Sequence, residues 1–177
     1  MTRVERRRNY FHDSWSSLAI SVLWCLTMCV QCSNAVTQAE VDLVAEFFIA
    51  TKFANETPCT LTTICNTWPA LIVCNTVGVT AMNFTDQSLT GTLPASLSMM
   101  PFLASFMAQS NSLSGTLPPE YSAWGTRLVS FYVGGNQLNG TLPSEYAAWR
   151  SLIGFSTIAN NLTGTLPGCG SRFHQEH

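Results

Sequence analysis

The chain has 177 residues, of which 46% are hydrophobic and 10% are charged, and its formal net charge is −2. The apolar content is sufficient for a folded core. The low charge, without a basic stripe, excludes a nucleic-acid partner and gives no surface for anionic lipid.

Residues 1–35 have the parts of a secretory signal peptide. Arg3, Arg6, Arg7 and Arg8 form a basic start, an apolar run extends from Leu18 to Val30, and Ser33-Asn34-Ala35 is a small-residue cleavage site. The apolar run is shorter than the roughly 20 residues that a membrane span needs. We therefore expect cleavage after Ala35, which leaves four basic and eight acidic residues and a net charge of −4.

Cleavage would leave four of the seven cysteines: Cys59, Cys65, Cys74 and Cys169. In the oxidising secretory pathway, an even number of cysteines predicts disulfides, although four cysteines allow three connectivities. Cys65 and Cys74 flank Trp68 and an apolar segment, as in a stapled cap. We expect these two cysteines to pair, and no partner is assigned to Cys59 or Cys169.

A helix is predicted to begin at Thr37. Thr37 and Glu40 have the spacing of a capping box, in which each side chain accepts a hydrogen bond from the other residue's backbone. Apolar residues at helical spacing follow over 41–49, and the pattern ends near Asn55. Such a helix would cover the open first edge of a sheet, since a bare edge invites pairing with another chain.

Four copies of L-x-G-T-L-P dominate the rest of the chain. Their glycines, Gly91, Gly115, Gly140 and Gly164, are separated by 24, 25 and 24 residues. A fixed period in the twenties predicts a solenoid, and each unit fits the leucine-rich-repeat template. That template places Asn at its ninth position, where the chain has Asn111, Asn136 and Asn160, and Gln87 in a degenerate first unit.

The template predicts an α/β fold. Alternation such as Phe106-Met107-Ala108 has a period of two, so stacked copies form a parallel sheet. The asparagines turn inward to serve buried backbone groups of neighbouring turns. Beyond each Pro, apolar residues such as Tyr121 and Trp124 form the inward side of a short helical or 3₁₀ segment, with the tyrosine hydroxyls within reach of water. We therefore predict a leucine-rich-repeat solenoid with a parallel sheet on its concave face, helical segments on its convex face and a helical N-terminal cap.

The chain divides into four expected parts: a signal peptide at 1–35, a disulfide-stapled cap at 36–78, four repeats at 79–167 and an irregular tail at 168–177. The tail is too short and too polar to cap the stack. Phe155, Leu162 and Leu166 would then be uncovered at the far end, as in a truncated copy of a longer protein.

Two segments carry a family resemblance. Residues 115–124 read G-T-L-P-P-E-Y-S-A-W, and residues 140–149 read G-T-L-P-S-E-Y-A-A-W. The repeats resemble the plant-type subclass of leucine-rich repeats and, more closely, the promastigote surface antigen family of trypanosomatids, which repeats G-T-L-P before a Glu-aromatic pair. The resemblance extends over residues 36–167. It implies a secreted or lipid-anchored surface glycoprotein that acts in host and immune-component recognition, without catalysis.

The chain departs from that family in three features. It has no Thr/Ser-rich stalk, no C-terminal Cys-rich cap and no anchor signal. Membrane attachment would therefore require a longer chain or an uncleaved leader.

Four N-x-[ST] sequons follow the leader, at Asn55, Asn83, Asn139 and Asn161. Glycans there would supply the solvation that the few charges do not. The repeat consensus itself generates the sequons at Asn139 and Asn161, so coincidence is the alternative. We expect at least one site to be occupied.

Solenoids bind partners through their concave sheet. Period two exposes the residues beside the inward ones, which makes Asn83, Met107, Gln109, Tyr132 and Ser156 the candidate ligand-binding residues. This row is uncharged and has one aromatic residue. We expect apolar and hydrogen-bonded contacts with a protein or glycan ligand, and the alternative is a glycosylated surface with no specific ligand there.

Catalysis and metal binding have few candidates. His12 lies in the leader, His174 and His177 lie in the tail, and the sequence has no other His to act as a base or metal ligand. We expect no cofactor, no metal and no enzymatic activity. The predicted function is recognition by a secreted or cell-surface glycoprotein; a secreted inhibitor of the polygalacturonase-inhibitor type, a receptor ectodomain fragment and a truncated non-functional copy are the alternatives.

Overall fold

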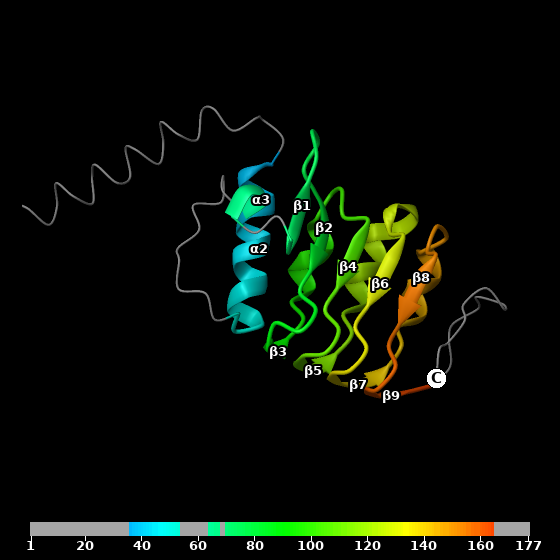
Figure 1. Ribbon diagram of the computed structural model, residues 1–177. Coiled ribbons are helices and arrows are strands. Elements are labelled where there is room, and N and C mark those ends of the chain that lie inside the picture. Colours follow the sequence, from blue (N-terminus) through cyan, green and yellow to red (C-terminus); the bar gives the residue numbers. More distant parts are fainter. Residues whose placement is uncertain (1–35, 54–63, 68–69, 165–177) are drawn as a thin grey trace, which may run out of the picture. The chain divides into compact units, whose positions relative to one another are not determined.

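The repeats build two sheets whose strands follow one another along the stack (Figure 1). The computed structural model describes residues 36–53, 64–67 and 70–164. The predicted leader, Asn55, Cys59, Leu166 and the tail with Cys169 lie outside this range.

The first sheet has the order β1-β2-β4-β6-β8 and consists of β1 (Ile72–Cys74), β2 (Val79–Asn83), β4 (Ser105–Met107), β6 (Ser130–Tyr132) and β8 (Gly154–Ser156). The second sheet has the order β3-β5-β7-β9 and consists of β3 (Thr90–Thr92), β5 (Ser112–Thr116), β7 (Gln137–Thr141) and β9 (Asn161–Thr163). The helices are α2 (Gln38–Ala50), α3 (Ile64–Thr67) and the 3₁₀ helices η2 (Ala95–Met99), η3 (Pro119–Arg127) and η4 (Ser144–Ala148).

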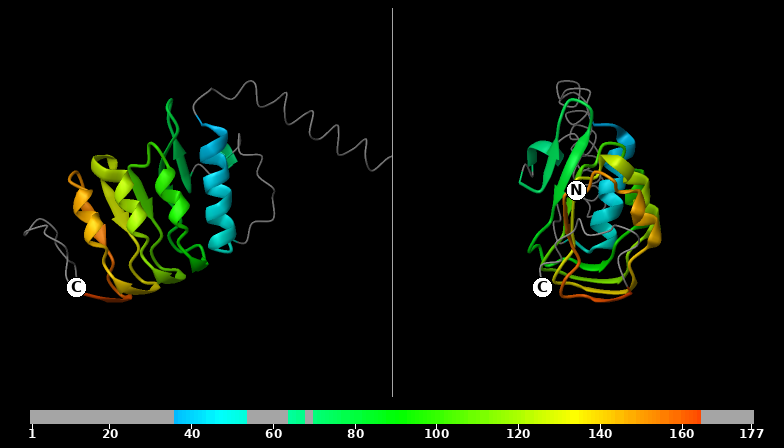
Figure 2. Two further views of the ribbon diagram at one scale, coloured as in Figure 1. Left: turned by 180° about the vertical axis from the view of Figure 1, so that it is seen from behind. Right: turned by 90° about the vertical axis from the view of Figure 1, so that its right-hand side faces the viewer.

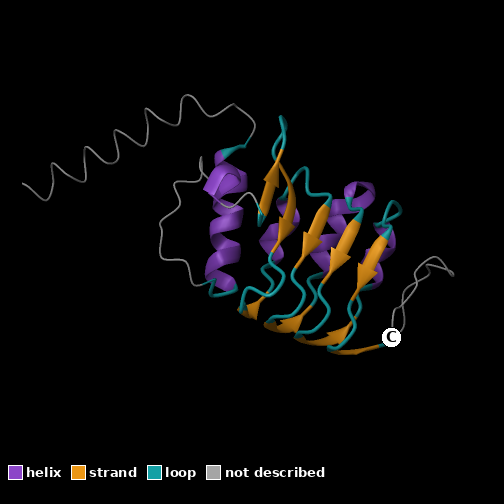
Figure 3. Ribbon diagram, in the orientation of Figure 1, coloured by secondary structure: helices purple, strands orange, loops and turns teal. Residues whose placement is uncertain are grey.

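Each turn runs from the first sheet to the second and then to the 3₁₀ helices. Figure 2 shows the first sheet on one side and the 3₁₀ helices on the other, and Figure 3 shows the second sheet joining them along one margin. The strands of successive turns pair in parallel in both sheets. The predicted leucine-rich-repeat solenoid is confirmed.

A column of phenylalanine rings fills the space between the layers. The ring centroid of Phe106 lies 5.8 Å from that of Phe131, and the centroid of Phe131 lies 6.1 Å from that of Phe155. Phe47 of α2 extends the column at the other end, 5.9 Å from Phe106. The rings of Phe47, Phe106 and Phe131 are fully buried, and that of Phe155 is partly buried. Each turn therefore depends on its neighbours for burial.

The ladder asparagines hold adjacent turns together. The amide nitrogen of Asn111 donates to the carbonyl of Phe84 at 2.8 Å, and its amide oxygen accepts from the backbone nitrogen of Leu89 at 2.9 Å. Asn136 and Asn160 make the same two kinds of bond to the turn before them. These side chains thereby satisfy buried backbone groups that no strand serves.

The sequence suggested that the tyrosine hydroxyls reach water, but in the structure they bond to backbone carbonyls. Tyr121 donates to the carbonyl of Pro94 at 3.0 Å, and Tyr146 donates to the carbonyl of Pro118 at 2.9 Å. Each hydroxyl therefore bonds one turn to the turn before it. Burial raises the pKa of both phenols well above the ordinary range, and nearby negative charge, including that of Glu120, adds to the effect.

The N-terminal elements differ from the prediction in how they cover the sheet. The first edge of the sheet pairs with β1, which runs antiparallel to β2 with Ile72 opposite Met82, and not with a helix. A strand can bond the free N–H and C=O groups of an edge, whereas a helix has already paired its own. Helix α2 instead covers the apolar interior, where Phe47 lies 5.1 Å from Phe84 between ring centroids.

Helix α2 begins with the predicted capping box but ends at Ala50, well before Asn55. The hydroxyl of Thr51 donates to the carbonyl of Phe47 at 2.7 Å, and Lys52 has a φ of 49°. A left-handed residue after a C-cap stops the helix and turns the chain.

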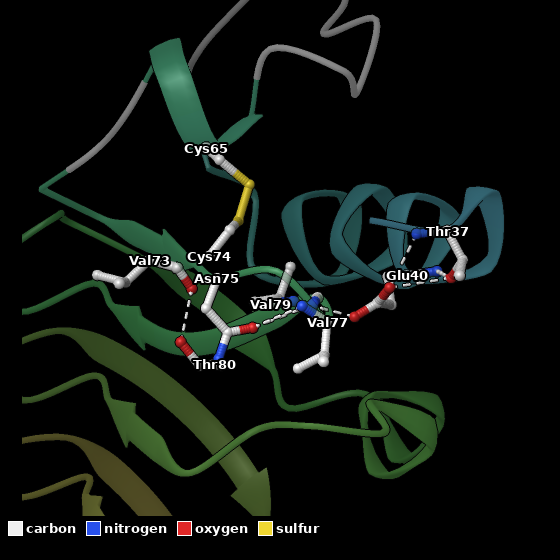
Figure 4. The surroundings of a disulfide bond; sticks show 10 residues. Thr37, Glu40, Cys65, Val73, Cys74, Asn75, Val77, Val79 and Thr80 are labelled. Atoms are coloured by element: carbon white, nitrogen blue, oxygen red, sulfur yellow. Dashed lines mark hydrogen bonds between the residues drawn. A yellow bond between two sulfur atoms is a disulfide. The ribbon is translucent and has the colours of Figure 1, made fainter. Parts of the chain in front are cut away.

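A disulfide joins Cys65 of α3 to Cys74 of β1, which is the pairing favoured by the sequence (Figure 4). The two Cα atoms are 5.7 Å apart. Glu40 lies nearby and links α2 to β2, because its carboxylate accepts from the backbone nitrogens of Thr37 at 2.9 Å and of Val79 at 3.0 Å.

Candidate functional site

The concave face is the exposed side of the first sheet. Its residues alternate with buried ones such as Met82, Phe106 and Phe131. Two rows follow the strand register across four turns: Ala81, Ser105, Ser130 and Gly154; and Asn83, Met107, Tyr132 and Ser156. A third row of Thr85, Gln109, Gly134 and Ile158 lies just past the strand ends, where backbone hydrogen bonds still join consecutive turns and Gly134 is buried.

The register brings the predicted binding residues together. Asn83 is paired with Met107, Met107 with Tyr132, and Tyr132 with Ser156, so the four lie side by side on consecutive strands. Gln109 lies in the next row. The first row was missed, although extending the period of two backwards by one step along each strand would have found it.

The concave face carries no charge. Within the described residues, every charged side chain comes from α2, a 3₁₀ helix or a turn: Glu40, Asp42, Glu46, Lys52, Asp86, Glu120, Arg127, Glu145 and Arg150. The strands of the first sheet contribute amides, hydroxyls and apolar groups only. A ligand here would meet short-range contacts with little electrostatic steering.

Hydrogen bonds connect the polar side chains at the β2 end of this face. The hydroxyl of Thr85 lies 2.8 Å from the amide oxygen of Asn83 and 3.1 Å from that of Gln109. The amide nitrogens of Asn83 and Gln109 have no hydrogen-bond partner among residues 36–53, 64–67 and 70–164. This end of the face therefore offers free donors beside partly used acceptors.

At the other end, Tyr132 leans over the next strand. A Cβ on Gly154 would lie 2.7 Å from Cζ and 2.9 Å from Cε2 of this ring, so the ring can keep this pose only above a glycine. In the third row, a Cβ on Gly134 would lie 3.2 Å from Cγ1 of Ile158. Two glycines thus let side chains of neighbouring turns lie along the sheet.

The sequons fall on two different surfaces. Asn139 and Asn161 are exposed, and they are paired in register on β7 and β9 of the second sheet. Asn83 lies on the concave face, where it is also a predicted ligand-binding residue. A glycan on Asn83 would cover this end of the face, so glycosylation would exclude a ligand from this residue.

Residues 36–53, 64–67 and 70–164 contain no group of three or more His, Cys, Asp or Glu side chains that could hold a metal ion. Among the helices of these segments, none combines the length and the apolar character that crossing a membrane requires.

Neither a protein-family model nor a curated protein sequence matches the chain. Solved structures do. The leucine-rich-repeat ectodomain of the receptor kinase SOBIR1 from Arabidopsis thaliana matches with a TM-score of 0.61 and 17% identity, over 72% of this chain and 70% of that one. The Arabidopsis receptor kinase HAESA, in complex with the peptide hormone IDA and the co-receptor SERK1, matches with a TM-score of 0.61 and 20% identity.

A third match is the ectodomain of GASSHO1/SCHENGEN3 from Arabidopsis thaliana, in complex with CASPARIAN STRIP INTEGRITY FACTOR 2, with a TM-score of 0.53 and 21% identity over 72% of this chain. The match to HAESA covers 74% of this chain. This chain spans 23% of the HAESA chain and 19% of the GASSHO1/SCHENGEN3 chain. These likenesses show the fold, and the described part of the chain is a leucine-rich-repeat solenoid of the plant type.

Proposed function

We propose that this protein is a non-catalytic recognition module of the secreted or cell-surface kind, and that its concave face binds a protein or glycan ligand. The observation that carries the proposal is the continuous row formed by Asn83, Met107, Tyr132 and Ser156 across four paired strands. A solenoid sheet of this kind offers an extended surface with side chains at regular spacing.

Two observations support the extracellular part of the proposal. Cys65 and Cys74 form a disulfide, which persists in oxidising compartments. The signal-peptide pattern of residues 1–35 would direct the chain there.

Asn139 and Asn161 lie exposed on the second sheet, where glycans would leave the concave face free.

The promastigote surface antigen family is the model we propose for the biological role. The shared Glu-Tyr pairs place Tyr121 and Tyr146 in the convex core, where their hydroxyls bond consecutive turns. The resemblance thus rests on residues that build the stack. The matched receptors HAESA and GASSHO1/SCHENGEN3 are complexed with a peptide hormone and a named factor, which supports protein ligands as one class.

An inhibitor of the polygalacturonase-inhibitor type is a poorer fit, because recognition of a charged enzyme surface calls for complementary charge. The first sheet has none in its described strands.

The test compares two methionines on opposite sides of the solenoid. Met107 lies on the concave face, and Met99 is 72% exposed on η2. Three proteins are secreted from eukaryotic cells: the unchanged full chain, the Met107→Glu variant and the Met99→Glu variant. Each is screened against arrays of extracellular protein domains and of glycans. We expect a ligand whose binding falls at least about tenfold in Met107→Glu, because a buried charge at an interface costs affinity, and stays unchanged in Met99→Glu.

Absence of any bound ligand would contradict the proposal, and so would equal loss in both variants. Retention of the wild-type chain inside the cells without its disulfide would contradict the extracellular assignment.

A further inference from the structure

We propose that the ligand of the concave face is a neutral oligosaccharide that lies across the strands with one sugar ring against Tyr132. This inference rests on the proposed function and names its ligand class.

The lack of charge on the strands of this face favours a neutral ligand. The described strands of the first sheet carry no charged side chain, so no strand residue would pair with an acidic sugar or a charged peptide side chain. A charge on the ligand would lose its hydration without a partner, which is costly. The complement of an uncharged face is an uncharged ligand.

The polar groups of this face can both donate and accept hydrogen bonds. Asn83 and Gln109 each offer an amide with both donors and an acceptor, and their amide nitrogens have no partner among the described residues. Ser105, Ser130 and Ser156 add hydroxyls, which both donate and accept. A sugar hydroxyl also donates and accepts, so it can bond with any of these groups.

The pose of Tyr132 suits a sugar ring. Its ring leans over Gly154, where a Cβ would come within 2.7 Å of the ring. The glycine therefore leaves room for the ring to lie over the next strand, and Tyr132 is partly exposed to solvent. An aromatic face in this position can take the apolar side of a hexose ring by stacking, with its hydroxyl as a polar handle.

The spacing of the strands matches the length of a sugar unit. Consecutive strands of a parallel sheet are about 4.8 Å apart, so the four turns span about 14 Å from β2 to β8. A hexose unit is about as long as one such step. A linear oligosaccharide running across the strands would therefore place successive rings over successive turns, from Asn83 towards Ser156.

The experiment uses the fraction of the secreted full chain that mass spectrometry shows to be unglycosylated at Asn83. It measures binding to uncharged tetrasaccharides of glucose, mannose and galactose, to tetragalacturonate as the acidic counterpart, and to a displayed library of random decapeptides. Three variants are compared: Tyr132→Ala, Tyr132→Phe and, as a control, Met99→Ala on the convex side. We expect binding of at least one neutral tetrasaccharide, weakened about tenfold by Tyr132→Ala and nearly unchanged by the other two.

Tyr132 lies at the surface, and the urea midpoint of each variant checks that it is folded. Stronger binding of tetragalacturonate, saccharide binding that ignores Tyr132→Ala, or no saccharide binding would overturn the inference. Decapeptides that bind in a Tyr132-dependent way while saccharides do not would overturn it too, and would leave the proposed recognition function intact.

Discussion

One residue in each turn has a left-handed backbone just before the ladder position. Ser110, Gly135 and Ala159 have φ values of 55°, 66° and 52°. The asparagine that follows each of them reaches the turn before its own. Gly adopts this conformation freely, and Ala adopts it only at a cost of about 1–2 kcal/mol.

Ala159→Gly should therefore stabilise the protein. The relief of the left-handed strain exceeds the roughly 0.5–1 kcal/mol of extra chain entropy that Gly loses on folding, so the free energy of unfolding should rise by about 0.5–1 kcal/mol. Urea unfolding measures the change. Ala147→Gly is the matched control, because Ala147 lies in η4 at an ordinary φ, and it should be destabilising. Equal effects at both sites would refute the strain.

The raised pKa of Tyr146 predicts sensitivity to alkali. The folded state keeps the phenol proton at a pH where an unfolded tyrosine, with a pKa of about 10, loses it. The stabilisation is therefore fully present below about pH 10 and is lost as the pH rises further. Tyr146→Phe should lower the free energy of unfolding at pH 8 by about 1 kcal/mol, because the bond to Pro118 is lost, and should weaken its decline above pH 10.

Urea unfolding of the wild type and Tyr146→Phe at pH 8, 9, 10 and 11 makes this comparison. The double variant with Tyr121→Phe should flatten the decline further, since Tyr121 is buried in the same way. Identical pH profiles for all three proteins would contradict the claim that the buried tyrosine hydroxyls cause the loss of stability above pH 10.

Among single residues, the ladder asparagines could be assigned from the sequence because their position in the template fixes their surroundings. Gln87 departs from the template, and its amide nitrogen donates to the carbonyl of Thr85 within its own turn. The second bond of Glu40, to Val79, could not be foreseen, because the two residues are far apart in sequence and only the fold brings them together.

At the scale of elements, the cap depends on one buried carboxylate. Glu40 is 1% exposed, and its two oxygens accept from the start of its own helix and from the start of β2. Charge-assisted bonds of this kind are about twice as strong as neutral ones. Glu40 therefore orients α2 against the first turn.

Glu40→Gln should lower the free energy of unfolding by about 1.5–3 kcal/mol, because an amide NH₂ would face a backbone N–H where an oxygen now accepts. Glu46→Gln is the matched control, since Glu46 is exposed on the same helix, and it should change the free energy by less than about 0.5 kcal/mol. Both are measured by urea unfolding, and a Glu40→Gln protein as stable as its control would refute the linking role.

The strands of the first sheet and the convex segments could be predicted, because apolar residues recur there with periods of two and of three to four. The second sheet could not. Its strands contain the glycine of L-x-G-T, which has no side chain to mark the alternation of a strand. Gly115 also has a φ of 81°, outside the range of a regular strand. The antiparallel β1 was also missed, since an apolar segment alone does not reveal its direction of pairing.

At the scale of the whole described molecule, the charged side chains are separated from the strands of the concave face. Charged side chains lie on helices and turns, and the concave face carries amides, hydroxyls and Tyr132. The exposed sequons at Asn139 and Asn161 lie on the second sheet, away from this face. The arrangement leaves one continuous uncharged surface for a ligand, and it depends entirely on the stacking of consecutive turns.

The stacking of turns is tested most directly by nuclear Overhauser contacts between phenylalanine rings, in deuterated protein with protonated Phe side chains. The centroid separations of 5.8 Å and 6.1 Å predict ring-to-ring cross-peaks from Phe106 to Phe131 and from Phe131 to Phe155, with none from Phe106 to Phe155. Absence of the two neighbour cross-peaks in folded protein, or a direct contact between Phe106 and Phe155, would contradict the stacked interior on which the concave face depends.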